Sequence, residues 1–155
     1  MYQVIGAMVA RYNLQTNWKA RAKREDVCDI LFDEVHFPRW WKGVMLEVTP
    51  LAEGDGNGIG RRAAFRARMK WPATVNWVAE VTETDLPRRW TVRAHGDLAG
   101  QGEWVLRQKG GVADIENRWA FEFGKPALRR LAPLIWPVVQ SNYRWAMARG
   151  LDGLG

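Results

Sequence analysis

The stretch that decides the fold lies near the C-terminus, where residues 116–147 read ENRWAFEFGKPALRRLAPLIWPVVQSNYRWAM. In its first part, mainly apolar and mainly polar positions alternate, with Asn117, Trp119 and Phe121 in the same phase. A period of two is typical of a half-buried antiparallel strand. From Pro126 the apolar residues recur every three or four positions, which predicts a helix of about 25 residues with one apolar face. That face is expected to consist of Leu128, Leu131, Ile135, Val138, Asn142, Ala146 and Met147.

Tryptophan extends the alternating pattern toward the N-terminus. The chain has ten tryptophans in 155 residues, and many of them occupy the apolar phase of a period-two segment. Because that phase points to one side of a sheet, these rings should line one interior, and the C-terminal helix should close it. A curved sheet lined with indoles and covered by a helix favours a large hydrophobic cavity. The tryptophans in question are Trp18, Trp77, Trp90, Trp104 and Trp119.

The remaining segments complete an α+β order. A first helix is predicted from Arg24 to Pro38, with its apolar residues at Val27, Ile30, Leu31 and Val35, and a helical turn follows at 37–42. Pro133 and Pro137 should kink the C-terminal helix or divide it near 131–137. Strands are expected at 13–22, 44–52, 59–69, 74–83, 89–97, 101–108 and 112–123. Their connections are the loop 54–58, a break at Trp71-Pro72, the turn 85–88, a bulge or bend within 96–102, and a hairpin at Gly110-Gly111.

Length and composition predict a single domain over residues 1–155, since 155 residues with 47% hydrophobic content can bury a core without metals or disulfides. Residues 1–12 are interpreted as an N-terminal extension: an extra strand, a frayed end, or the product of an upstream start codon. The single cysteine, Cys28, lies in an apolar helical stretch, which favours a buried thiol and a reducing cytoplasm. The first ten residues lack a basic start, and no long apolar run occurs, so neither secretion nor membrane insertion is expected.

The formal net charge of +6 raises two classes of anionic partner. The strand at 59–69 presents a basic outer phase, which could contact an anionic membrane surface transiently. Nucleic acid ranks lower, because no aromatic side chains are interleaved with these bases. A GC-rich coding sequence would also enrich arginine without any functional cause. The basic phase consists of Arg62, Arg66, Arg68 and Lys70.

Several segments of this chain resemble the SRPBCC superfamily (START-like, plant pollen-allergen-like), and within it the bacterial polyketide cyclase/dehydrase-like group. The resemblance implies a helix-grip fold, in which a curved antiparallel sheet of about seven strands wraps round a long C-terminal helix and two short helices follow the first strand. Members of the superfamily bind lipids, sterols, polyketides, hormones and quinones; some are enzymes and many are carriers. The segments are Phe37–Trp41, Gly58–Gly60, Trp77–Val81, Gly96–Trp104, and the terminal helix with Leu131–Pro133 and Met147.

Several chemistries find no support in the sequence. The glycines of 54–60 form a hairpin and do not lead from a strand into a helix, so a phosphate loop is not expected. His36, His95 and Cys28 have no metal-ligand spacing, and no metal or cofactor is predicted. Ser141, the only serine, lies in a helix away from any nucleophile elbow.

Phase assignment defines a candidate ligand site. Asn117 is the clear polar residue among inward aromatic ones, and it needs either a ligand hydroxyl or a neighbouring backbone group as its partner. Asn142 and Tyr143 lie on or near the helix face over the cavity, where they either bind a ligand oxygen or simply pack. The predicted ligand-binding residues are Trp18, Phe65, Trp77, Trp90, Trp104, Asn117, Trp119, Asn142 and Tyr143.

Two classes of function fit such a cavity. The favoured one is binding of a small hydrophobic molecule, such as a lipid, an isoprenoid or an aromatic polyketide-like compound. The alternative is an enzyme of the polyketide cyclase/dehydratase type, which needs a proton-transfer group inside the cavity. His95 and Asp97 are the candidates for that catalytic role, if a bulge at Gly96 turns one of them inward; otherwise they are solvent-facing strand residues. Binding is favoured because the inward phase supplies almost no ionisable group.

Overall fold

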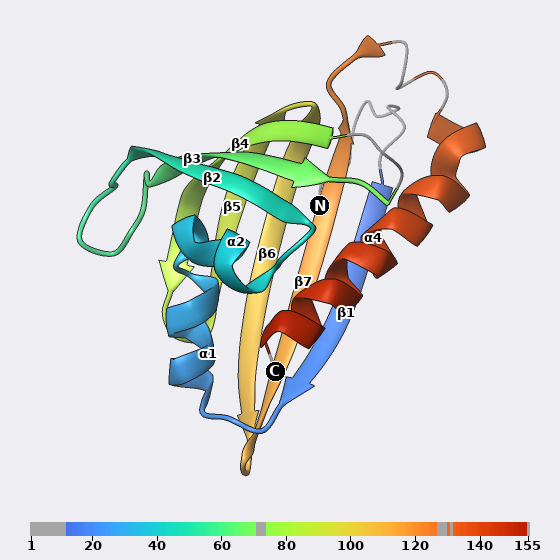
Figure 1. Ribbon diagram of the computed structural model, residues 1–155. Coiled ribbons are helices and arrows are strands. Elements are labelled where there is room, and N and C mark those ends of the chain that lie inside the picture. The colour runs from blue at the N-terminus through green and yellow to red at the C-terminus, as the bar shows by residue number, and fades with distance from the viewer. Residues whose placement is uncertain (1–11, 71–73, 127–129, 131, 155) are drawn as a thin grey trace.

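The structure is a computed structural model, which describes residues 12–70, 74–126, 130 and 132–154 (Figure 1). All but the last residue of the predicted N-terminal extension, 1–12, lies outside the described residues, and so does the predicted break at Trp71-Pro72. The described residues show a curved antiparallel sheet with one long helix across it, which confirms the predicted fold class.

The sheet has seven strands in the order β1-β7-β6-β5-β4-β3-β2, and every neighbouring pair is antiparallel. Each predicted strand is present. Alternate residues are buried in strands such as β3 and β4, as a period-two pattern predicts, whereas β2 has no fully buried residue. The β5–β6 connection contains Gly96 at φ +128°, a region that favours glycine. The strands are β1 (Tyr12–Ala20), β2 (Met45–Ala52), β3 (Arg62–Arg68), β4 (Thr74–Asp85), β5 (Arg89–Gly96), β6 (Leu98–Lys109) and β7 (Val112–Phe123).

The segment after β1 is divided more finely than the sequence predicted. Helix α1 (Arg24–Leu31) ends well before Pro38, a 3-10 turn η2 (Glu34–His36) follows, and α2 (Phe37–Trp40) comes next. Pro38 occupies the first turn of α2, where a missing backbone N–H costs no intrahelical bond, so it begins a helix and does not end one. Val35 is consequently exposed, and the predicted single helix through Val35 was wrong.

Helix α4 (Ala132–Leu154) crosses the concave side of the sheet, as Figure 1 shows. It continues through Pro137 as one element, whereas we predicted a kink or a division near 131–137. Val138 is 40% exposed and its neighbour Val139 is buried, so the predicted apolar face was wrong by one residue at this point. Val139 and Met147 are buried on the same side of the helix, because they lie eight residues apart, which is two steps of four.

The C-terminal end of α4 is anchored against α2. The indole Nε1–H of Trp41 donates a hydrogen bond to the carbonyl of Ala146 at 2.8 Å. Gly150 allows the helix to approach this ring, since a Cβ there would lie 2.6 Å from the Trp41 indole. This anchor fixes one end of α4 over the sheet and thereby sets the height of the space beneath it.

Candidate functional site

A cavity of about 170 Å³ lies between the concave face of the sheet and α4. All seven strands contribute to its wall, most of all β3, β4 and β7, and the segment from η2 to α2 together with α4 supplies its cover. Most of its lining is aromatic or aliphatic, as is typical of sites for hydrophobic small molecules. The residues predicted for the ligand site that do line the cavity are Phe65, Trp77, Trp104, Asn117, Trp119, Asn142 and Tyr143.

Trp18 and Trp90 are buried but do not line this cavity, so the prediction that they face it was wrong. Both pack against Trp104, with ring centroids 5.6 Å and 6.2 Å away. Other rings cover them: Trp41 lies 5.9 Å from Trp18, and Phe32 lies 5.3 Å from Trp90. Packed aromatic rings therefore fill the space between α1 and the sheet. The cavity lies farther along the strands, between the sheet and α4.

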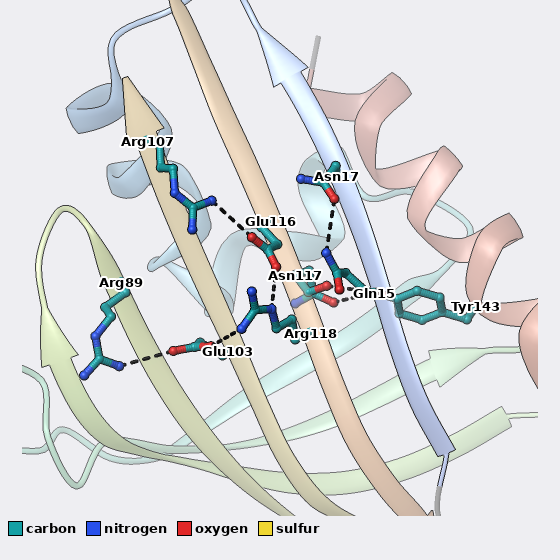
Figure 2. A network of polar contacts seen from close by, with 9 residues as sticks. All are labelled: Gln15, Asn17, Arg89, Glu103, Arg107, Glu116, Asn117, Arg118 and Tyr143. Carbon is teal, nitrogen blue, oxygen red and sulfur yellow. Dashed lines mark hydrogen bonds and ion pairs between the residues drawn. The ribbon is translucent and has the colours of Figure 1, made fainter. Parts of the chain in front are cut away.

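Asn117 is the most buried polar side chain of the cavity wall, with 1% of its surface exposed. Its Oδ1 accepts a hydrogen bond from the hydroxyl of Tyr143 at 2.8 Å, and Figure 2 shows Tyr143 reaching it from α4. Its Nδ2 has no hydrogen-bond partner among the described residues. Burial raises the pKa of Tyr143, so its hydroxyl keeps its proton and remains a donor. The pair thus leaves the amide nitrogen of a cavity-lining residue without a partner.

Sequence reasoning missed Glu34, which is 8% exposed and, among the described residues, is the only carboxylic acid that lines the cavity. Arg61 Nη2 lies 3.2 Å from its Oε1. Burial raises the pKa of Glu34 from 4.5 to about 7, although the charge and hydrogen bond of Arg61 act in the opposite direction. We did not single out this residue, although a helix with Val27 and Leu31 on its buried face also carries position 34 on that face, seven and three residues further along.

His95 and Asp97 do not reach the cavity, which corrects the catalytic role predicted for them. His95 is exposed and pairs in register with Val78, so it lies in the outward phase of β5. The Asp97 carboxylate accepts a hydrogen bond from the backbone N–H of Asn76 at 2.8 Å. The unusual backbone of Gly96 lets the chain turn between strands but leaves both side chains beside an outer groove.

Asn142 joins the rim of the cavity to the sheet. Its Oδ1 accepts a hydrogen bond from the backbone N–H of Lys70 at 2.7 Å, while the residue itself lines the cavity. Arg68 also lines the cavity at this end of β3. The basic phase predicted on β3 is exposed at all four of its positions, Arg62, Arg66, Arg68 and Lys70.

The outer face of β5, β6 and β7 carries a separate ionic network, drawn in Figure 2. Glu103 of β6 joins Arg89 of β5 at 3.2 Å and Arg118 of β7 at 3.8 Å. Glu116 binds Arg118 and lies 3.1 Å from Arg107. Burial alone would raise the pKa of Glu116, but hydrogen bonds from these two arginines lower it. These cross-strand pairs stabilise the sheet and take no part in the cavity.

Other site types find no support in the part of the chain that the structure describes. No group of three metal-ligating side chains gathers there. None of the described helices is long and apolar enough to cross a membrane. Cys28 is free and buried, and burial, followed by the charges of Asp29 and Glu25, raises the pKa of its thiol to about 11.

The fold and the cavity define a helix-grip protein, and comparisons with solved structures agree. A protein from Thermus thermophilus has a TM-score of 0.77 at 20% identity, over 92% of this chain and 94% of its own. The Zhui aromatase/cyclase from Streptomyces has a TM-score of 0.71 at 13% identity, over 93% of this chain and 91% of its own. A START superfamily protein from Mycobacterium smegmatis has a TM-score of 0.70 at 11% identity, over 92% of this chain and 99% of its own.

The chain therefore has the helix-grip fold that the resemblance of its segments predicted. No protein-family model matches the chain, and no curated protein matches it. The likeness establishes the fold, and the function has to be argued from the cavity itself.

Proposed function

We propose that this protein binds a small hydrophobic molecule in the cavity between the sheet and α4. The volume of about 170 Å³ supports a ligand with a single ring, since a protein cavity of about 150 Å³ holds benzene. Lipids, isoprenoids or polyketide-like compounds with more rings would extend beyond this volume. We expect the protein to act in the cytoplasm, where a free buried thiol such as Cys28 is stable.

The unused amide donor of Asn117 is the observation that carries this proposal. A buried polar group without a partner costs about 1–3 kcal/mol, and a ligand that supplies an acceptor would remove this cost. A ligand carbonyl or ether oxygen would satisfy that donor, while the surrounding rings bury the rest of the molecule. Tyr143 holds the amide by its oxygen, which leaves the Nδ2 hydrogens for the ligand.

Calorimetric titration with two probes of matched shape tests the proposal. Acetophenone carries a carbonyl oxygen, and isopropylbenzene replaces it by a methyl group. Both should bind with saturation, and acetophenone should bind about tenfold more tightly, which corresponds to one net hydrogen bond. Asn117→Leu should abolish that preference, whereas His95→Gln, on the outer side of β5, should retain it. If neither probe binds, the proposed function is wrong.

Glu34 supports a second candidate function, that of an enzyme of the cyclase/dehydratase type. It brings to the cavity a carboxyl group whose pKa lies near neutrality, which general acid–base catalysis requires. As a base, Glu34 would remove a proton from a carbon next to a ligand carbonyl, and the electron pair would move to the carbonyl oxygen. Exchange of the acetophenone methyl hydrogens in D₂O, followed by NMR, tests this. If the protein is a carrier, the methyl hydrogens exchange at the rate seen in buffer alone. If it is an enzyme, the wild type accelerates this exchange and Glu34→Gln does not.

The basic phase of β3 supports transient contact with an anionic membrane surface during ligand uptake. Its four side chains are exposed, and Arg68 also lines the cavity. Each cation near such a surface contributes about 1 kcal/mol, and the attraction weakens with salt. Phosphatidylserine vesicles should therefore sediment the protein at low salt but not the quadruple Gln variant of Arg62, Arg66, Arg68 and Lys70. A control with the same change in charge, which should still sediment, replaces exposed Arg21, Lys23, Arg93 and Lys125.

A further inference from the structure

Glu34 gives the cavity a second polar group, apart from the Asn117–Tyr143 pair. It comes from the turn η2 between α1 and α2, whereas Asn117 comes from β7 and Tyr143 from α4. Both groups line the same cavity, and the residues around them are largely apolar. A ligand that fills the cavity therefore meets polar atoms from two separate parts of the fold.

The contacts of Glu34 leave one of its oxygens unused. Arg61 reaches Oε1 and also donates a hydrogen bond to the carbonyl of Phe32. Its guanidinium lies 4.0 Å from the centre of the Phe32 ring and borders two outer grooves, but it does not line the cavity. Glu34 itself borders one of these grooves as well as the cavity, and Arg61 approaches it from the outer side. Among the described residues, Oε2 has no hydrogen-bond partner, although more than nine-tenths of the Glu34 surface is buried.

The charge of this site decides which ligand group it accepts. The guanidinium of Arg61 balances an ionised Glu34, so the pair offers no net negative charge to a cation. A cation would also lose its hydration among the aromatic rings Phe37 and Phe65, at a cost that an already neutralised carboxylate does not repay. A neutral hydroxyl loses far less on burial, and a carboxylate oxygen is a strong acceptor for its hydrogen.

We propose that the cavity selects a neutral ring compound with two polar groups, a hydroxyl that donates to Glu34 and an oxygen that accepts from Asn117. A hydroxylated aromatic ketone belongs to this class. The inference rests on the proposed binding function and specifies its ligand. Burial of Glu34, which brings its pKa near neutrality, adds a second effect: a hydroxyl donor favours the ionised carboxyl, so binding should release a proton.

The test uses the complete chain and two aromatic ketones that differ in one group. Hydroxyacetophenone with the hydroxyl in the para position donates a hydrogen bond, and para-methylacetophenone has nearly the same shape without a donor. Calorimetry at a neutral pH should show at least tenfold tighter binding of the hydroxyl compound to the wild type. Glu34→Met should remove this preference, and the exposed-site control His95→Gln should keep it.

The possible results separate this inference from the proposed function. Equal affinity of the wild type for the two ketones overturns the role of Glu34, while their binding still supports a ligand cavity. Absence of binding for both, and for acetophenone as well, overturns the proposed function. If Glu34→Met fails to fold, the proton released on binding tests the role of Glu34 in the wild type. Calorimetry of the hydroxyl compound in two buffers of different ionisation enthalpy measures this proton, and binding without proton release would overturn the role of Glu34.

Discussion

The buried carboxyl of Glu34 makes the stability of this protein depend on pH in a direction opposite to that of an ordinary paired carboxylate. Its pKa is about 7 in the folded protein, against 4.5 when unperturbed. Between these two values the folded state binds a proton that the unfolded state has released, so stability falls as the pH rises. At about 1.4 kcal/mol for each pH unit, the loss amounts to about 3 kcal/mol between pH 4 and pH 8.

Replacing Glu34 by glutamine removes this dependence, because the neutral amide does not titrate and has nearly the same shape. We expect the free energy of unfolding of Glu34→Gln to equal that of the wild type near pH 4 and to exceed it by about 3 kcal/mol near pH 8. Urea denaturation at half-unit pH steps measures both curves. Glu53→Gln, at an exposed site nearby, should follow the wild type throughout. A constant difference between Glu34→Gln and the wild type across this range would refute the argument.

Other substitutions test the packing that surrounds the cavity. Tyr143→Phe removes the 2.8 Å hydrogen bond to the Asn117 side chain and should cost about 1–3 kcal/mol in urea denaturation; an unchanged midpoint would count against a formed bond. Asn117→Leu should preserve stability within about 1 kcal/mol, because it removes an unsatisfied donor and leaves the Asn117 backbone carbonyl, 3.4 Å from the Tyr143 hydroxyl; a large loss would mean that the amide is satisfied. Gly150→Ala should cost about 1–3 kcal/mol in the same assay by forcing Cβ against the buried Trp41 ring, whereas Gly56→Ala, with open space around it, should not. Equal effects of the two glycine substitutions would contradict the close contact of α4 with α2.

The strands were predictable because their signal is local. In β7 the alternation of residues continues from Val112 to Phe123, and each residue's side of the sheet follows from the parity of its position. The same argument correctly placed Phe65, Trp77 and Asn117 on the cavity wall. It could not distinguish these residues from Trp18 and Trp90, because parity reports the face of a sheet and not the distance along it.

Periodicity indicates that Glu34 is buried, since a helix face through Val27 and Leu31 also passes through position 34, but it does not indicate that Glu34 lines a cavity. Between α1 and α2 the chain passes through a 3-10 turn of three residues, and each change of helix type rotates the following side chains. A continuous helix would also bury Val35, whereas this turn leaves Val35 exposed. Arg61 contacts both the Phe32 carbonyl and Glu34 and so links the two sides of the turn.

The sequence by itself determined the order of the strands and helices, the aromatic face of the sheet, and the amide at Asn117, because each follows from the spacing of neighbouring residues. Tertiary structure decided where the cavity opens and which tryptophans pack in the core instead of lining it. It also placed His95 and Asp97 outside the cavity and Glu34 in its lining. These properties arise where α1, α2 and α4 meet the sheet, through contacts such as that of Trp41 with Ala146, 105 residues apart in the chain. The spacing of residues within one segment cannot predict such contacts. They depend on the shapes of two surfaces that form only when the chain has folded.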